Sequence, residues 1–357
     1  MFLSSYESLR KKLSLQETVN MAHLGARAFD EIGGEVVQTT AFVKRQTKIS
    51  GYKETYVRLI GIYGEQEKSE SFLSGQNRYI ADSDNFAKIP GSPVAYWVSE
   101  KFIRCFENDL IGTFADTRNG ITTGANETFL REWFEVPFIK IALNISSSKE
   151  AAISTKKWFL YNKGGSRRKW YGNNEFVVDW ENNGFKLKTQ TDSFGKIHSV
   201  LRSPQYYFKE CISWSKISSG DISFRYFPKG YIFDVAGCCA FFKKESNFYQ
   251  IFAFLNSKIA QNILQILSPT LNYEVGHIAS LPILPNIPDS VVPVVQSNIA
   301  ISREDWDAFE TSWDFKRHPL IRKVDTIEEA FIAWEKECAK RFRQLKANEE
   351  ELNRIFI

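Results

Sequence analysis

Apolar residues recur every three or four positions along two stretches of this chain. From Phe248 to Leu267 this spacing predicts one amphipathic helix that Pro269 ends. A second helix is expected from Thr326, because Glu329 three residues later completes a capping box. Its apolar stripe comprises Ile327, Phe331, Trp334, Cys338, Phe342 and Leu345. The acidic run 349–351 at its far end opposes the helix dipole, so that end should fray or be neutralised by a partner.

The N-terminal part alternates helical and strand-like segments. A helix ending near Leu13, a short strand over 18–22 and a β-branched run over 35–44 indicate a piece of an α/β sheet. Residues 50–115 hold mixed segments, with helical spacing over 94–106, and we expect a connector packed on this first module.

From residue 119 to 242, short β-rich runs are separated by glycine and asparagine turn signals. Strands are expected over 176–180, 222–227 and 231–235. The predicted fold class is therefore α+β, with a fragment of an α/β sheet, then a mainly β module, then a C-terminal helical region.

The composition is that of a folded chain with many flat side chains. Its 357 residues suffice for two modules, each with its own core. Aromatic residues make up 15% and there are only 11 prolines, which is far from the composition of a disordered chain. The net charge of +4 is mild, so any preference for polyanions must come from local clustering.

The five cysteines follow neither the CxxC spacing of a zinc site nor a disulfide framework. Reduced core thiols and no metal are therefore expected. No signal peptide opens the chain, and no apolar run approaches the ~20 residues of a membrane span. We expect a cytoplasmic protein that does not contact a membrane.

The densest charge feature is the basic loop, residues 156–171, which holds six cations and no acidic residue. Cations beside aromatic rings and a flexible Gly-Gly-Ser segment suit phosphate contacts and base stacking. The residues predicted to contact DNA there are Lys156, Lys163, Arg167, Arg168, Lys169, Trp170 and Tyr171. A weaker group with side chains that hydrogen-bond phosphates and base edges comprises Lys216, Ser218, Ser219, Arg225 and Tyr226. A solvated loop whose basic tips happen to cluster would show the same pattern.

A catalytic set is harder to find. The four histidines, His23, His198, His277 and His318, lie in separate contexts, none beside a nucleophile motif. No Walker A loop and no GxGxxG occurs. The carboxylates of Asp305 and Asp314 with Lys316 faintly suggest a metal-dependent nuclease triad, although such spacings often arise by chance.

Seven runs of this chain are long and distinctive. They are FDEIGGEVVQTTAFV at 29–43, PGSPVAYW at 90–97, GITTGAN at 120–126, WFLYNKGG at 158–165, RKWYGN at 168–173, PTLNYEVG at 269–276 and EEELNRIF at 349–356. Together they closely resemble PglX, the family of adenine-specific DNA methyltransferases of BREX phage-defence systems. That family is similar in layout to type IIG restriction-modification enzymes, and the resemblance covers essentially the whole chain.

The resemblance implies that this chain is only the C-terminal portion of such an enzyme. Family members carry an S-adenosylmethionine loop of the F-x-G-x-G kind and an N-P-P-Y motif that grips the flipped adenine, and this sequence has neither. The nearest imitation, Ser-Pro-Gln-Tyr at 203–206, lacks the second proline. We therefore expect no catalytic residue, no cofactor and no methyltransferase activity in this chain alone, and we expect Met1 to fall within the family's architecture, just downstream of that motif.

The family also implies a division into modules. Residues 1–115 would be the C-terminal remnant of the methyltransferase domain plus a connector, residues 116–290 the target recognition domain, and residues 291–357 a helical C-terminal region. This portion would clamp double-stranded DNA and read base edges while the missing half extrudes an adenine and methylates its N6. The alternative is a protein-interaction module, in which the Phe331, Trp334 and Phe342 stripe and the acidic tail dock a defence-complex partner or a phage inhibitor.

Overall fold

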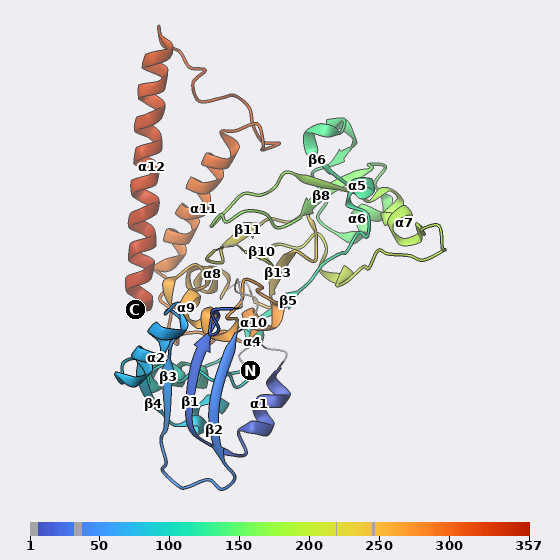
Figure 1. Ribbon diagram of the computed structural model, residues 1–357. Helices are drawn as coiled ribbons and strands as arrows, with labels where there is room; N and C mark the ends of the chain where they lie inside the picture. The colour runs from blue at the N-terminus through green and yellow to red at the C-terminus, as the bar shows by residue number, and fades with distance from the viewer. Residues whose placement is uncertain (1–5, 32–37, 219, 245–246) are drawn as a thin grey trace. The chain divides into compact units, whose positions relative to one another are not determined.

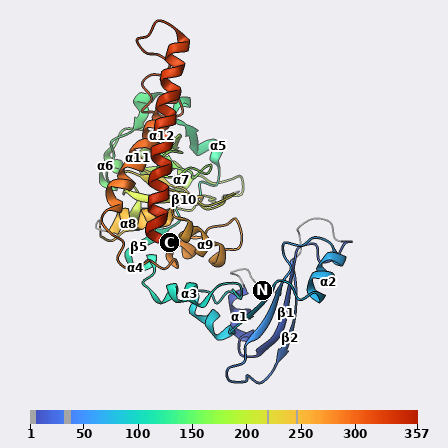
Figure 2. The same cartoon turned by 90° about the vertical axis from the view of Figure 1, so that its left-hand side faces the viewer.

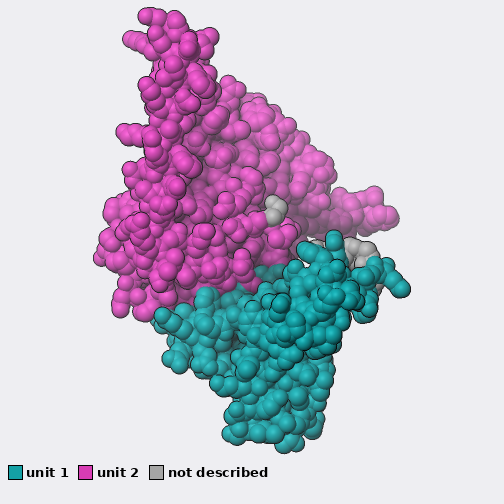
Figure 3. All heavy atoms as spheres, turned by 60° about the vertical axis from the view of Figure 1, so that its left-hand side comes forward, with its two compact units in different colours: residues 1–109, 266–269 teal, residues 110–265, 270–357 magenta. Residues whose placement is uncertain are grey.

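The computed structural model describes residues 6–31, 38–218, 220–244 and 247–357. They form two compact units, residues 1–109 with 266–269, and residues 110–265 with 270–357 (Figure 3). Both units mix helices and strands, so the predicted α+β class is confirmed. Within these described residues, no helix is long and apolar enough to span a bilayer.

The first unit is built on a four-stranded sheet with the strand order β2-β1-β3-β4 (Figure 1). Strand β1 pairs antiparallel with β2 and parallel with β3, and β3 pairs antiparallel with β4. The elements are α1 (Glu7–Leu13), β1 (Glu17–Gly25), β2 (Thr39–Arg45), β3 (Glu54–Arg58), α2 (Glu65–Leu73), β4 (Arg78–Ala81), η2 (Ser83–Lys88), α3 (Glu100–Ile103) and η3 (Arg104–Glu107). The expectation of a mere connector over 50–115 is thus wrong, because this region supplies two strands of the sheet. Residues 35–37 of the predicted strand run lie outside the described residues.

A small aromatic core holds this sheet. Met21, Tyr56, Phe86 and Tyr96 are buried together, and the rings of Tyr56 and Tyr96 stack with centroids 4.7 Å apart. The Nδ1 atom of His23 lies 3.0 Å from the Tyr96 hydroxyl. Burial lowers the pKa of His23 to about 4, so this histidine is a neutral core residue at physiological pH.

The second unit contains two sheets, with the orders β11-β10-β13-β5 and β12-β8-β9-β6, and β7 pairs with β8. The strands are β5 (Ala115–Arg118), β6 (Leu130–Glu132), β7 (Ile141–Ala142), β8 (Trp158–Asn162), β9 (Phe176–Asp179), β10 (Cys211–Ser215), β11 (Phe224–Phe227), β12 (Ile232–Phe233) and β13 (Gly237–Phe242). Every residue of β8 and β10 is buried, which is the pattern of strands covered on both faces. The strands predicted over 176–180, 222–227 and 231–235 correspond to β9, β11 and β12.

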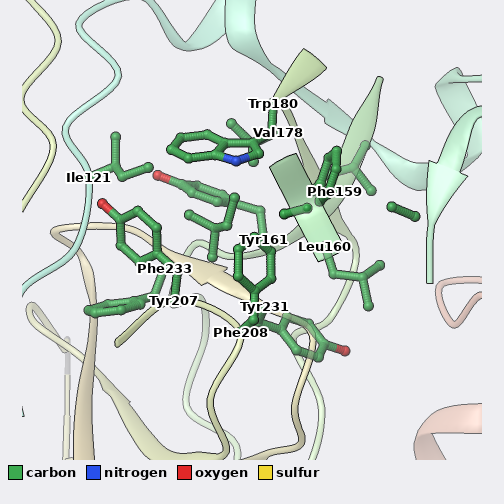
Figure 4. Close-up of a cluster of buried hydrophobic side chains, with 14 of the residues drawn as sticks. Ile121, Phe159, Leu160, Tyr161, Val178, Trp180, Tyr207, Phe208, Tyr231 and Phe233 are labelled. Atoms are coloured by element: carbon green, nitrogen blue, oxygen red, sulfur yellow. The ribbon is translucent and has the colours of Figure 1, made fainter. Parts of the chain in front are cut away.

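Aromatic side chains fill the core around β8 and β9 (Figure 4). Trp180 meets Tyr207 edge to face with centroids 5.7 Å apart. The Tyr161 hydroxyl donates to the carboxylate of Asp234 at 2.6 Å, which satisfies this buried polar group. Much of the high aromatic content of the sequence therefore lies in this core and not on the surface.

Short helices lie between the strands, and longer helices follow them. They are α4 (Ile111–Phe114), α5 (Asn126–Phe129), η4 (Trp133–Glu135), η5 (Phe138–Lys140), α6 (Ser148–Ile153), α7 (Glu181–Thr189), η6 (Pro204–Tyr206), α8 (Phe248–Leu255), α9 (Lys258–Leu267), α10 (Val275–Ala279), α11 (Val291–Asp307) and α12 (Ile327–Phe356). The prediction of a single helix over 248–267 is wrong, because the helix is interrupted at residues 256–257, between α8 and α9. There the Asn256 side chain accepts from the backbone N–H of Phe224 at 3.1 Å and donates to its carbonyl at 3.2 Å. These bonds hold Asn256 against strand β11 at the point where α8 ends.

Helices α11 and α12 lie side by side (Figure 2). The predicted start of α12 is confirmed, because the Thr326 hydroxyl accepts from the backbone N–H of Glu329. Helix α11 lies in the region 291–357 that was expected to be helical. Pro293 stands in the first turn of α11, where the missing N–H of proline is not needed. The two helices are joined by the Arg341–Glu304 ion pair at 2.6 Å.

Candidate nucleic-acid interface

The cations of the basic loop are paired with acids from distant parts of the chain. The pairs are Lys157–Asp179 at 3.5 Å, Lys163–Asp234 at 2.8 Å, Arg167–Asp221 at 3.9 Å, Arg168–Asp305 at 3.4 Å and Lys169–Glu349 at 2.9 Å. The sixth cation, Lys156, donates to the carbonyl of Ile139. The loop's excess of positive charge in the sequence is therefore largely balanced in the fold.

The two aromatic residues at the end of this loop are buried. Trp170 is 1% exposed, and its indole N–H donates to Glu349 at 2.8 Å. Tyr171 is also buried, with the Arg303 guanidinium 5.2 Å from its ring centroid, and burial raises the pKa of Tyr171 to about 12. The predicted stacking of these rings on bases needs correction, because both faces are covered by protein. These residues attach α11 and α12 to the β module.

Arg225 also differs from the prediction. It is 0% exposed on β11 and donates to the Ser215 hydroxyl at 3.0 Å and to the carbonyls of Ser166 and Arg168 at 3.4 and 3.5 Å. Burial lowers the pKa of Arg225 to about 10, so it stays charged at neutral pH. A side chain buried in this way cannot reach a guanine, and the predicted base contact is corrected to a structural role.

The structure brings the basic loop and the weaker predicted group around Arg225 together. The backbones of Trp170 and Arg225 pair there as a parallel β-bridge. Of the remaining predicted residues, Lys216 pairs with Glu274 at 2.9 Å and the Tyr226 hydroxyl donates to Glu210 at 2.5 Å. Ser218 is half-buried and donates to the carbonyl of Asp221. Ser219 lies outside the described residues. For Lys216, Ser218, Ser219 and Tyr226, a DNA contact stays a prediction. The same holds for Lys156, Arg167 and Arg168 of the basic loop.

Within the described residues, the cations of a second stretch form no ion pair with a carboxylate of a neighbouring segment. Residues 182–209 contain five cations and a single acidic residue, Asp192. The cations are Lys186, Lys188, Lys196, Arg202 and Lys209. Lys186 and Lys209 lie over the rings of Phe129 and Tyr206, Lys188 donates to the carbonyl of Asn183, and Arg202 donates to the hydroxyl of Thr122. We call residues 186–209 the hairpin surface, because a bridge between Thr191 and Ile197 closes a short hairpin within it.

Asp192, the one acid of the hairpin surface, has its carboxylate bonded within the turn. The Asp192 carboxylate accepts from the backbone N–H groups of Phe194 and Lys196 at 2.8 and 2.9 Å. It also contacts Nε2 of His198 at 2.6 Å. The contact with His198 and these backbone donors hold the pKa of Asp192 below its usual value. The hairpin surface therefore presents mainly positive charge to solvent, which is the property a phosphate backbone selects.

Tyr206, near the end of the hairpin surface, lies between two cations. The ring centroid of Tyr206 lies 5.3 Å from the Arg118 guanidinium and 5.2 Å from the Lys209 ammonium. Its hydroxyl donates to Asp116 at 2.8 Å, which fixes the ring on the edge strand β5. No residue of the hairpin surface was predicted to bind DNA, although the cation count of 182–209 was a signal in the sequence that could have found this surface.

The suggested nuclease triad does not assemble. Asp305 pairs with Arg168, and Asp314 pairs with Arg303 at 3.3 Å. Among the described residues, no three histidine, cysteine, aspartate or glutamate side chains come together as a cation site. Both carboxylates serve ion pairs that hold α11.

An apolar cavity of about 260 Å³ lies within the first unit. Its lining includes Met21, Tyr56 and Phe86 together with the cations Arg10 and Lys44. The lining acid Asp84 is paired with Lys48 at 2.6 Å. S-adenosylmethionine carries a sulfonium and an ammonium charge besides its single carboxylate, and its ribose hydroxyls usually bond to a free carboxylate of the protein. The cavity does not fit that cofactor.

The whole chain is similar to part of two larger proteins. It is 43% identical over 372 residues to the adenine-specific methyltransferase PglX of Lacticaseibacillus casei (strain Zhang), and 37% identical over 360 residues to the adenine-specific methyltransferase BrxX of Escherichia coli O9:H4 (strain HS). These alignments cover 100% and 99% of this chain but only 31% and 28% of the relatives, so the chain spans about a third of their length. No family model matches.

The chain is thus homologous, over its whole length, to a portion of adenine-specific methyltransferases. Within that class the relatives are of the PglX and BrxX type, which confirms the resemblance found in the sequence.

Two solved structures show a more distant similarity. The type IIL restriction-modification enzyme MmeI in complex with DNA is 11% identical, with a TM-score of 0.49 over 99% of this chain and 45% of that chain. The type IIG restriction endonuclease BpuSI is 11% identical, with a TM-score of 0.34 over the same shares of the two chains.

Proposed function

We propose that this chain is the DNA-recognition part of an adenine-specific (N6) DNA methyltransferase acting in phage defence, with double-stranded DNA as its partner. The observation that carries this proposal is the hairpin surface, whose five cations avoid carboxylates in the described structure. The relatives over the full length are named adenine-specific methyltransferases, which supports the reaction class.

In this proposal the chain binds and positions DNA, and the reaction occurs elsewhere in the protein. Lysine and arginine contacts to phosphates set the register of the duplex but carry no sequence information. Base edges in a groove carry that information, and extrusion of the adenine costs a few kcal/mol that groove contacts help to offset. The cofactor S-adenosylmethionine is held outside this chain, a proposal that the unsuitable lining of the cavity in the first unit supports.

We expect the triple variant Lys186→Ala, Lys188→Ala and Lys196→Ala to bind every duplex more weakly, whatever its sequence. The slope of log affinity against log salt should fall by about 0.9 for each phosphate that the protein no longer neutralises. Anisotropy titrations of a labelled duplex at several salt concentrations measure both quantities.

A matched control removes the same charge far from the hairpin surface. Lys323, Lys336 and Lys340 are exposed residues of the C-terminal region, and their triple alanine variant should keep the wild-type slope. Equal weakening by both triples would mean that overall charge, and not the hairpin surface, governs binding.

A second candidate function is a protein-interaction module. Phe331 and Phe342 on α12 are 50% and 67% exposed, as an aromatic docking surface would be. The acidic tail is not available to the same partner without rearrangement, since Glu349 already pairs with Lys169 and Glu351 with Arg354. Binding that hardly responds to salt would favour this function over DNA recognition.

A further inference from the structure

The most exposed large apolar side chain in the described part of the protein lies at the tip of the hairpin. Phe194 is 93% exposed, in the turn 192–196 that follows α7 (Figure 1). A phenyl ring left in water is less favourable than a buried one. Single exposed apolar side chains are common, so the surroundings of Phe194 decide whether a partner covers it.

The turn that presents Phe194 is tightly built. Besides the two bonds to its carboxylate, Asp192 donates its backbone N–H to the carbonyl of Lys196 and accepts from the N–H of Gly195, both at 3.0 Å. Gly195 has a φ of +78°, a conformation that few side chains tolerate. The ring therefore stands on a defined turn, which limits the entropy lost when it binds.

The base of the hairpin is anchored by the GITTGAN run that was distinctive in the sequence. Thr122 and Val200 exchange both backbone hydrogen bonds, at 2.8 and 2.9 Å. A Cβ on Gly124 would lie 2.6 Å from the Cβ of His198, so only glycine allows this approach. The Ser199 hydroxyl also donates to the carbonyl of Leu187, which ties the hairpin to α7.

The charge around Phe194 identifies the occupant. Lys196 stands two residues away, and Lys186 and Lys188 precede the hairpin on α7. The only acid of the tip has its carboxylate bound by the turn. An apolar tip within a stretch whose free charges are positive matches a duplex, whose phosphates surround stacked bases, better than an apolar protein surface.

We propose that the turn 192–196 is a wedge that inserts Phe194 between adjacent base pairs of duplex DNA. Inserted apolar side chains unstack a base step and kink the duplex, and this lowers the cost of extruding a neighbouring base. The inference rests on the proposed function, since it presumes that this chain binds DNA.

The test compares the full chain with the variants Phe194→Ala, Phe194→Leu and Phe185→Ala. Phe185 is the matched control, a phenylalanine on α7 that is 64% exposed and outside the turn. The probe is a duplex selected by the wild-type chain from a randomised pool, with 2-aminopurine substituted in turn at each adenine. Fluorescence of 2-aminopurine rises when the base is unstacked, and anisotropy of the same duplex gives the affinity.

Wild-type chain should raise the fluorescence at one or two adjacent positions. Phe194→Ala should abolish that rise and weaken binding roughly 5- to 150-fold, the range found for base–aromatic contacts. Phe194→Leu should keep most of the rise, and Phe185→Ala should behave as wild type.

Two results would overturn the wedge while leaving DNA recognition intact. One is binding by the wild-type chain with no unstacked position. The other is a Phe194→Ala variant whose fluorescence rise and affinity match those of the wild type, or change only as much as those of Phe185→Ala. Failure of the wild-type chain to bind any duplex would instead overturn the proposed function itself.

Discussion

Replacing Trp170 by alanine is expected to lower the free energy of unfolding of the second unit by about 3–5 kcal/mol, the cost of removing a fully buried aromatic side chain. The indole ring packs against Phe252 with centroids 5.1 Å apart, and its N–H is bonded to Glu349. The backbone of Trp170 has a φ of +70°, which an alanine would share, so the loss reflects the side chain. Chemical denaturation of the two proteins measures it.

Two further variants separate packing from hydrogen bonding. Trp170→Phe keeps most of the ring but leaves Glu349 without the indole donor, so it should cost about 1.5–3 kcal/mol. Glu349→Gln keeps an acceptor for the indole but loses the ion pair with Lys169, and its cost should be smaller. If Trp170→Ala unfolded like the wild type and lost only DNA affinity, the ring would belong to the interface, as the sequence had suggested.

Gly120→Ala is expected to destabilise the second unit by about 3 kcal/mol or more, the upper end for overpacking. A Cβ at this position would lie 1.7 Å from the carbonyl oxygen of Phe233 and 2.4 Å from its carbon. Neither atom can move freely, because Ile121 donates its backbone N–H to that same oxygen at 2.8 Å. Thermal or chemical unfolding compares the variant with the wild type.

Gly276→Ala provides the control for this substitution. A Cβ there meets nothing within 4 Å, so stability should change by no more than about 0.5 kcal/mol. Equal stability of the two variants would show that the close approach of residues 120 and 233 is not as tight as described.

Local features of the fold were predictable from the sequence, and features set by distant contacts were not. The start of α12 followed from Thr326 and Glu329, which bond to each other across three residues. At the break between α8 and α9, Asn256 bonds to Phe224, 32 residues away, and no periodicity in the helix signals that contact.

The candidate site shows the same limit. The six cations of the basic loop are contiguous in sequence, but Lys163 and Lys169 are bonded to acids 71 and 180 residues away. The excess of cations over 182–209 was visible in the sequence, although more dispersed. The exposure of Phe194 and the anchoring of the hairpin at Gly124 arise only from tertiary structure.

The central claim is that the hairpin surface is the main place where DNA binds. Its most direct test is acetylation of lysine side chains in the full chain, with and without saturating duplex DNA, read residue by residue by mass spectrometry. DNA should protect Lys186, Lys188, Lys196 and Lys209 and leave the reactivity of Lys163 and Lys169, which are paired with acids, unchanged. Protection confined to the basic-loop lysines, with the hairpin lysines fully reactive, would contradict the claim.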